Sequence, residues 1–540
     1  MIRTWANYFK SENKSETILF VLLSVFTMSL PFSKSFISIF SVLALVFSIY
    51  IGLKNKTLVP KFSSDYSWVA LVAIYMVYLF GLIFTRDIKL GLYEINKEVN
   101  WFVLPLALFL MPRLSKQKVD LLFFLFLVSV SISSLISFAK MIYASDAGLM
   151  NFREVNFISH INFSLQISFA LFILLYSFFG ENSFLTKIRL WQRIVLVIWF
   201  LFILVAIKSM LGLISFYVAS IFYVLYFIRR MTKGKVRSAF LIMAIVFYII
   251  PLVYVASVTR TFYAHHEPSY ENAEKYTKQG NPYVFDLGKK DKENGYYVYW
   301  YLCFEEMENA WNERSTIKFY DRLPQGYRVA ETLQRYLTSK GLKKDAEGVA
   351  ALSSRDIRNV EAGIANYIYD APVYAIYPRV YETIWEIDKY IRTGDPNSQS
   401  LSQRFEYFKA AQLIIDKHFW IGVGTGNFKD AYYHAFKEMG SKLHESNYSF
   451  VHNQYVSYWV KFGLFGLLFI IFLLFFVAVK KNLFRNGLFV LFFVLQLVAN
   501  MGDANWETHV GLAFFVFFFS LFLWHTDMTK AKDMQKSPRG

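Results

Sequence analysis

Repeated apolar runs of about 20 residues constrain this chain more strongly than any other feature of its sequence. A run of this length crosses a bilayer as a helix, because helices and closed barrels alone pair every backbone group within lipid. The chain is 55% hydrophobic, more than a typical soluble domain. We therefore predict an all-α polytopic membrane protein with about twelve transmembrane helices. The expected spans are 17–32, 35–53, 66–84, 98–112, 119–141, 158–179, 191–207, 209–228, 238–257, 455–479, 486–501 and 509–525.

Lysine and arginine are concentrated in alternate short loops, and this alternation predicts the orientation of the spans. The loop 229–237 carries five basic residues, whereas the loop 502–508 carries none. Both termini are therefore expected in the cytoplasm and the long segment 258–454 on the outer face, which is the periplasm of a Gram-negative cell. The net charge of +17 lies largely in these short loops, so it does not indicate a nucleic-acid-binding surface.

The expected domain organisation follows the spans. It consists of a membrane domain over 1–257, a periplasmic loop domain over 258–454 with a motif region at 400–454, a second membrane segment over 455–525 and a cytoplasmic tail over 526–540. The large insert between the ninth and tenth spans is expected to be mixed, with helices at 321–339 and 356–369 and short strands and turns within 258–305. Cys303 is the only cysteine, so no intrachain disulfide is possible.

The most informative polar sequence precedes the tenth span. Ser400 and Gln403 have the spacing of a capping box and predict a helix that begins there, with Arg404 in its first turn. A cation in this place opposes the helix dipole, so Arg404 is either an exposed surface residue or one that pairs with an anion. The segment Gly422–Phe428 lacks the Lys-Ser/Thr of a P-loop, and we predict a tight connector that turns closely against the membrane domain.

Candidate functional residues lie where polar sequence meets the outer ends of spans. His452, Asn453 and Gln454 stand at the mouth of the tenth span, and ionisable groups near a bilayer are functional hypotheses by default. The alternative is that His452 only ends a helix among the lipid headgroups and has no catalytic role. Lys208, on the same predicted side, either snorkels to the headgroups or has a functional role. Arg153, at the outer start of the sixth span, raises the same question.

Taken in order, these elements resemble the O-antigen ligase and polymerase superfamily. The family pattern is R-x-x-x-(W/Y/F)-x-x-A, then G-x-G-x-G-x-F, then H-N-x-(Y/F)-L, then G-L-x-G-L. It is filled by Arg404 with Phe408 and Ala411, by Gly422–Phe428, by His452–Tyr455 and by Gly463–Leu467. Two departures stand out. Val456 replaces the usual Leu, and Lys208-Ser209 replaces a Ser-Arg pair, which keeps the cation but loses its planar fork. The large insert resembles Bacteroidetes-type members.

The resemblance implies a GT-C-like glycosyltransferase architecture in the bacterial inner membrane and a part in lipopolysaccharide biosynthesis. The implied reaction moves an O-antigen-like glycan from a polyprenyl (undecaprenyl) pyrophosphate carrier to a sugar hydroxyl of lipid A-core or a related acceptor. The leaving pyrophosphate requires fixed cations, for which Arg404, Lys208 and Arg153 are the candidates.

The acceptor hydroxyl requires a general base, and a histidine that titrates near neutral pH suits this task. We expect His452 to act as the base, with Asn453 or Gln454 orienting the substrate. The resemblance also implies a metal-independent, inverting enzyme without a cofactor.

Three other functions remain open at this point. A polymerase that joins repeat units and a protein O-oligosaccharyltransferase use the same chemistry on other acceptors. A polysaccharide transporter or flippase belongs to a different class, and transporters commonly carry charged groups at the membrane midplane. The spans here are nearly free of charge and the polar residues gather on one face, which favours an enzyme. The expected partners are the lipid-linked donor, the glycan acceptor and membrane lipids, with no nucleic acid.

Overall fold

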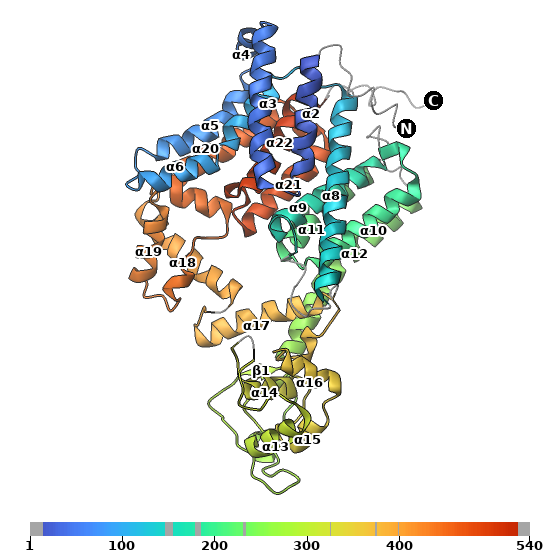
Figure 1. Cartoon of the computed structure of the whole chain (residues 1–540), viewed down its shortest axis with the longest axis vertical. Helices are drawn as coiled ribbons and strands as arrows, with labels where there is room; N and C mark the ends of the chain where they lie inside the picture. The colour runs from blue at the N-terminus through green and yellow to red at the C-terminus, as the bar shows by residue number, and fades with distance from the viewer. Residues whose placement is uncertain are drawn as a thin grey trace. The chain divides into compact units, whose positions relative to one another are not determined.

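The computed structural model describes residues 14–145, 155–178, 185–230, 234–323, 326–372, 375–397 and 399–526. Contacts within the chain divide it into two units, one formed by residues 1–233 and 395–540 and the other by residues 234–394. Both units are built mainly from helices (Figure 1).

Apolar helices make up most of the first unit, together with more polar helices, of which α18 and α19 precede the tenth expected span. Its helices are α2 (Lys14–Ser29), α3 (Lys34–Lys54), α4 (Leu58–Ser64), α5 (Ser67–Gly81), α6 (Ile88–Lys97), α7 (Asn100–Leu110), α8 (Lys116–Ser145), α9 (His160–Ser177), α10 (Leu190–Ala206), α11 (Met210–Arg230), α18 (Ser400–Lys417), α19 (Phe428–Glu438), α20 (Gln454–Lys480), α21 (Gly487–Gly502) and α22 (His509–His525).

Each expected span overlaps a helix of the structure. Six described helices are long and apolar enough to cross a membrane, or up to seven if α4 and α5, which are bent by 88°, form one span. The helices α10, α21 and α22 are apolar but shorter. The structure thus confirms a mainly helical, polytopic membrane protein with six or more apolar candidate spans.

The interior of the first unit is centred on α22. This helix packs against α3, α7, α8 and α21, and nearly all of its side chains are buried. Its phenylalanines interlock with those of its neighbours, as in the stacked rings of Phe123 and Phe518 and of Phe492 and Phe515. A helix that is apolar all round belongs in an interior. The short loop 503–508 between α21 and α22 therefore stands on two well-packed helices.

The helix α20 is interrupted at Gly463, where φ is +67° and ψ is −177°. A side chain at this position would lie 2.2 Å from the backbone of Trp420, so only glycine fits the approach of the two segments. Figure 1 shows α20 beside α5, and the two helices are in contact. The break thus brings the segment before α19 against the middle of α20.

The second unit contains α12, a small hairpin and a group of short helices. Its elements are α12 (Lys235–Tyr263), β1 (Lys292–Glu293), β2 (Tyr296–Tyr297), α13 (Phe304–Arg314), α14 (Val329–Ser339), α15 (Ala346–Ala350), α16 (Ser354–Glu361) and α17 (Tyr377–Thr393). Short helices bury a core of their own, with Met307, Trp311, Leu333 and Val349 among its fully buried members. The helix α12 contacts α17 within this unit.

The expected elements of the insert are found with shifted bounds. The hairpin turns at Asn294-Gly295, both with positive φ, as the short strands and turns predicted within 258–305 require. The helix expected over 321–339 begins only at Val329, because a turn closed by Gly326 (φ +88°) precedes it. The helix expected over 356–369 ends at Glu361, ahead of Gly363 (φ +79°). The membrane-based division at 257/258 and 454/455 stays a prediction.

Candidate active site

His452 and Asp503 form the central pair of the candidate site. The Nδ1 atom of His452 lies 2.9 Å from Oδ1 of Asp503, and the two side chains are 37% and 16% exposed. His452 immediately precedes the N-cap of α20, whereas Asp503 directly follows α21. A carboxylate only accepts hydrogen bonds, so Nδ1 of a neutral His452 carries the hydrogen and Nε2 keeps its lone pair. The arrangement therefore presents Nε2 as an acceptor for a proton.

Arg404 approaches this pair from α18. Its Nη1 atom donates to the backbone oxygen of Gly502, the residue before Asp503, at 2.9 Å. The helix begins at Ser400, with Gln399 as the N-cap residue and without a side-chain cap, so the expected capping box is wrong. Ser400 is already helical and cannot cap the turn. Arg404 is partly buried, and a guanidinium has five N–H donors, so donors remain for an anion.

The ionisation of Asp503 reflects its neighbours. Burial by itself would raise the pKa of this carboxyl, but the hydrogen bond and positive charge of His452, the charge of Arg404 and the backbone N–H of Ala504 outweigh it. Together they hold the pKa of Asp503 below its usual value. Asp503 is thus a carboxylate at neutral pH and favours a positive charge on the imidazole after proton transfer.

Asn453 and Gln454 connect the start of α20 to the end of α21 and to the loop 503–508 that follows it. The amide oxygen of Asn453 caps α20, and its Nδ2 donates to the backbone oxygen of Met501 at 2.8 Å. The Oε1 atom of Gln454, which is fully buried, accepts from the backbone N–H of Trp506 at 2.9 Å. In this conformation both amides hold the loop, and their role in orienting a substrate stays a prediction.

Lys208 lies in the turn between α10 and α11. Its φ is +53°, and its neighbour Ser209 is buried and accepts a hydrogen bond from Ser164 of α9 at 3.1 Å. Leu211, three residues further on, packs so closely on Gly502 that an added Cβ there would lie 2.5 Å from it. The structure therefore places the Lys208 turn near the end of α21 that Arg404 contacts. Arg153 lies outside the described residues.

The glycine-rich segment packs directly on α20, as predicted for a tight connector. The N–H groups of Val423 and Gly424 donate to the backbone oxygens of Val460 and Lys461 at 2.9 and 2.8 Å. Gly422 has φ +76°, and a Cβ there would lie 2.5 Å from the backbone of Gly463. The close approach that was expected for this segment is confirmed.

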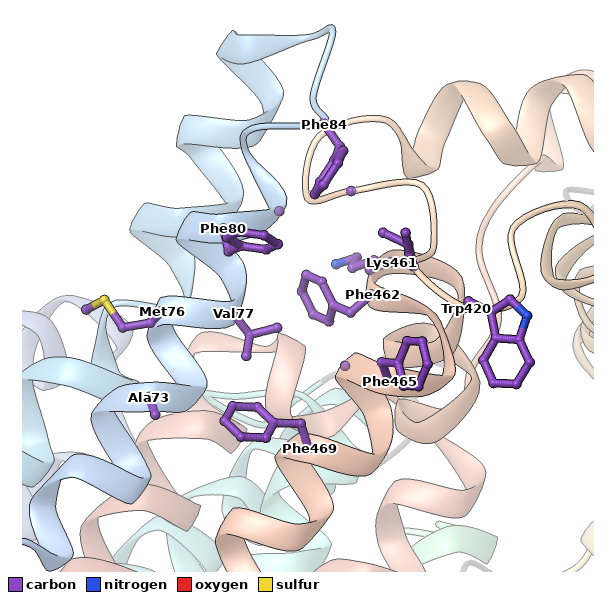
Figure 2. A pocket seen from close by; sticks show the side chains of 14 residues that line it. Ala73, Met76, Val77, Phe80, Phe84, Trp420, Lys461, Phe462, Phe465 and Phe469 are labelled. Atoms are coloured by element: carbon purple, nitrogen blue, oxygen red, sulfur yellow. The ribbon is translucent and has the colours of Figure 1, made fainter.

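An apolar cavity of about 770 Å³ lies between this segment, α5 and α20 (Figure 2). Figure 2 shows Phe80 and Phe84 on one side of it, and Phe462, Phe465 and Phe469 on the other. It is lined by Ala73, Met76, Val77, Phe80, Gly81, Phe84, Trp420, Ile421, Gly424, Lys461, Phe462, Phe465, Gly466 and Phe469. Lys461 is the only charged residue in this lining. The cavity has the shape and chemistry to hold part of an apolar chain.

Sequence reasoning missed Asp503. A signal was present, because Asp503 and Glu507 are the only charged residues in the loop 502–508 between two apolar spans, and such residues are functional candidates. Within the described ranges, no group of three or more His, Cys, Asp or Glu side chains is placed to hold a metal ion.

A family model described as O-Antigen ligase matches residues 362–471. The matched segment contains Arg404, the glycine-rich connector and His452, so it confirms the resemblance to the O-antigen ligase superfamily. Members of this family are glycosyltransferase-like enzymes. No curated protein matches the chain. Asp503 and Lys208 lie outside the matched range; the fold alone places Asp503 beside His452 and the Lys208 turn near Gly502.

Proposed function

We propose that this protein is a membrane glycosyltransferase of the O-antigen ligase type. In this proposal it moves an O-antigen-like glycan from a polyprenyl pyrophosphate carrier to a sugar hydroxyl of lipid A-core or a related acceptor. The observation that carries the proposal is that Arg404 and His452, both within the segment that matches the family, converge with Asp503 from outside it. A base oriented by a carboxylate and a cation beside it are what the reaction needs.

The proposed chemical step runs through the Nε2 atom of His452. The acceptor hydroxyl gives its proton to Nε2 while its oxygen bonds to the anomeric carbon of the donor sugar. The bond between that carbon and the phosphate oxygen breaks, and pyrophosphate leaves with the electron pair. Attack from the face opposite the leaving group inverts the anomeric configuration, and no metal ion or cofactor is required.

Arg404 and Lys208 are proposed to stabilise the leaving pyrophosphate. An arginine fork binds two phosphate oxygens at once, whereas a lysine acts as a point charge. The turn of Lys208 packs by way of Leu211 on Gly502, whose oxygen accepts from Arg404, so one leaving group can face both cations. Arg153 is kept as a third cation in the proposal.

The apolar cavity is proposed to hold part of the polyprenyl chain. Its walls come from α5 and α20, and His452 immediately precedes the N-cap of α20, so a chain seated there would lie along the helix that follows the base. Ala73→Phe would fill part of the cavity and raise the KM for the lipid-linked donor, with kcat little changed. A phenylalanine at Ile39, an exposed apolar position on α3, is the matched control. An unchanged KM in Ala73→Phe would place the chain elsewhere.

We further propose about twelve spans, cytoplasmic termini and a periplasmic segment 258–454, from the alternation of basic loops. A reporter inserted near Gly341 should be active only outside the cytoplasm, and one fused after Gly234 only inside. A cytoplasmic signal at Gly341 would contradict the function, because the lipid-linked donor and the loop would then lie on opposite sides.

The decisive experiment is a gel of surface polysaccharide from a deletion strain complemented with the wild type or with His452→Ala. Ligase activity predicts that the His452→Ala strain loses long chains from lipid A-core while lipid-linked polymer accumulates. Single-repeat products instead would indicate a polymerase, and glycan missing from proteins would indicate a protein oligosaccharyltransferase. Wild-type polysaccharide in the His452→Ala strain would contradict the whole proposal.

A further inference from the structure

The loop that carries Asp503 is held in place by one face of α20. Besides the Asn453 and Gln454 contacts, the Oγ atom of Ser457 donates to Oε1 of Glu507 at 2.8 Å, and Nζ of Lys461 lies 2.6 Å from Oε2 of Glu507. Positions 453, 457 and 461 are four residues apart and therefore lie on one face of a helix. The last contact on this face of α20 is the ion pair between Lys461 and Glu507.

Lys461 is a deeply buried cation with two buried partners. Its ammonium lies 3.0 Å from Oε2 of Glu94 and 2.6 Å from Oε2 of Glu507, and all three side chains are less than 10% exposed, at 2%, 3% and 7%. A fully buried carboxyl, Glu98, lies nearby, and Lys97 also pairs with Oε2 of Glu94 at 2.7 Å. Buried charges are tolerated only when they are paired, so removing the Lys461 ammonium would leave Glu94 with Lys97 but take the cation away from Glu507.

Glu507 and Asp503 belong to the same short loop between α21 and α22. It ends the short 3₁₀ turn Asn505–Glu507, and Asp503 lies four residues before it. Asn505 holds this turn to α21 by donating from Nδ2 to the backbone oxygen of Ala499 at 3.2 Å. Displacement of Glu507 therefore moves a tight turn that begins two residues after Asp503.

The geometry points to Lys461 as a positioning residue for the reaction: by binding Glu507, it fixes the loop that sets Asp503 against Nδ1 of His452. This inference rests on the proposed function, in which His452 is the general base. Within the part of the chain that the structure describes, Lys461 pairs with Glu94 and Glu507 and has no hydrogen bond or ion pair to His452 or Asp503. Its effect is exerted through Glu507, and a displacement of about 1 Å at a catalytic group costs up to about a hundredfold in rate.

The test compares Lys461→Met with a matched change at Lys481, the C-cap residue of the same helix. Lys481, just after α20, pairs with Asp65 at 2.6 Å, so Lys481→Met removes a lysine–carboxylate pair away from the loop. Purified full-length proteins are assayed for transfer with a lipid-linked donor over a range of pH. Lys461→Met should lower kcat about ten- to hundredfold with an unchanged KM for the donor, whereas Lys481→Met should resemble the wild type.

Two further readouts separate positioning from a general structural role. The rising limb of the pH profile should move in the same direction in Lys461→Met and in Asp503→Asn. The double variant should lose little more activity than Asp503→Asn alone, because both changes act on one contact. Lys461→Arg keeps the charge and should recover part of kcat. Additive losses, an equal loss in Lys481→Met or a wild-type pH limb would overturn the inference.

A raised donor KM with unchanged kcat would also overturn it, since Lys461 lines the apolar cavity and would then act on the carrier. If Lys461→Met does not fold, Glu507→Gln decides, because it keeps the Lys461–Glu94 pair and the shape of the side chain. It should show the same shift of the pH limb with a smaller loss of kcat. Should His452→Ala remain fully active, the proposed function fails; should only the Lys461 and Glu507 variants behave as wild type, the inference alone fails.

Discussion

The two units differ in how deeply their ion pairs are buried: the first contains a group whose side chains are all less than 10% exposed, whereas a pair of the second such as Arg335–Glu293, 36% and 2% exposed, keeps one partner toward solvent. In the first unit, Lys461, Glu94 and Glu507 meet inside an apolar bundle and are almost completely buried. In the second unit, pairs such as Lys278–Glu347 are open to solvent, with side chains 79% and 56% exposed. A buried charge survives only with fixed partners, whereas an exposed pair contributes little. The buried group around Lys461 therefore marks a place where the fold holds something in position.

Arg404→Ala removes a partly buried charge from the first unit and has the largest expected effect. We expect transfer to be abolished, and Arg404→Lys to recover it only in part, because lysine lacks the bidentate fork. Activity is measured with a lipid-linked donor at matched amounts of folded protein. Arg355→Ala, which removes an exposed arginine paired with Asp370 in the second unit, is the control and should stay active. Full activity in Arg404→Ala would show that Arg404 takes no part in transfer, as expected of an arginine that only faces solvent.

His452→Ala is expected to lower the rate of transfer by about 10²–10⁴-fold, the usual contribution of general base catalysis. The protein should remain folded and bind the donor, because the cations are unchanged. The rate of the wild type should rise with pH as the imidazole loses its proton, and this limb should be absent from the residual activity of the variant. Lost donor binding with an unchanged chemical step would instead make His452 a substrate-positioning residue.

Asp503→Asn sharpens the assignment of the base, with an expected loss of about ten- to hundredfold in kcat. The pKa of Asp503 is lowered, so the carboxylate is present throughout the neutral range and favours the protonated imidazole. Its removal should therefore move the rising limb of the pH–rate profile to lower pH. A limb that stays in place would show that Asp503 does not act on His452.

Asp356→Asn makes the corresponding change in the second unit and should leave transfer unaffected. Burial opposes the ionisation of Asp356, but hydrogen bonds from Lys340, Tyr336 and Ser353 hold its pKa below the usual value. A lowered folded-state pKa stabilises the unit above about pH 4 and ceases to do so as the pH falls further. The substitution should cost about 1–3 kcal/mol locally.

This local loss is measured as faster hydrogen exchange in α14 and α16 at neutral pH, with the difference from the wild type shrinking in acid. Lys278→Ala, at the exposed pair, is the control and should change neither exchange nor transfer. Equal exchange in Asp356→Asn and the wild type at neutral pH would mean that the second unit does not depend on its partly buried pairs either, and would weaken the comparison.

Local patterns accounted for much of the fold. The apolar runs placed every expected span on a helix, because a hydrophobic stretch of this length has few other ways to satisfy its backbone in lipid. Asn294-Gly295 is a strong turn signal and formed a hairpin. The start expected at 321 for the helix that begins at Val329, and the cap expected at Ser400, were wrong. Helix ends depend on single turns, which a neighbouring glycine or a shift of one residue decides.

The sequence by itself determined the apolar helices, the glycine-rich connector and two members of the candidate site, Arg404 and His452, because each follows from a local pattern or a family motif. Only the tertiary structure decided that Asp503 orients His452 and that Lys461 joins Glu94 to Glu507. Lys461 and Glu94 are 367 residues apart, and no spacing rule links residues on separate segments. Such pairs form where packed helices bring charges together without water, a property of the whole bundle rather than of any one segment.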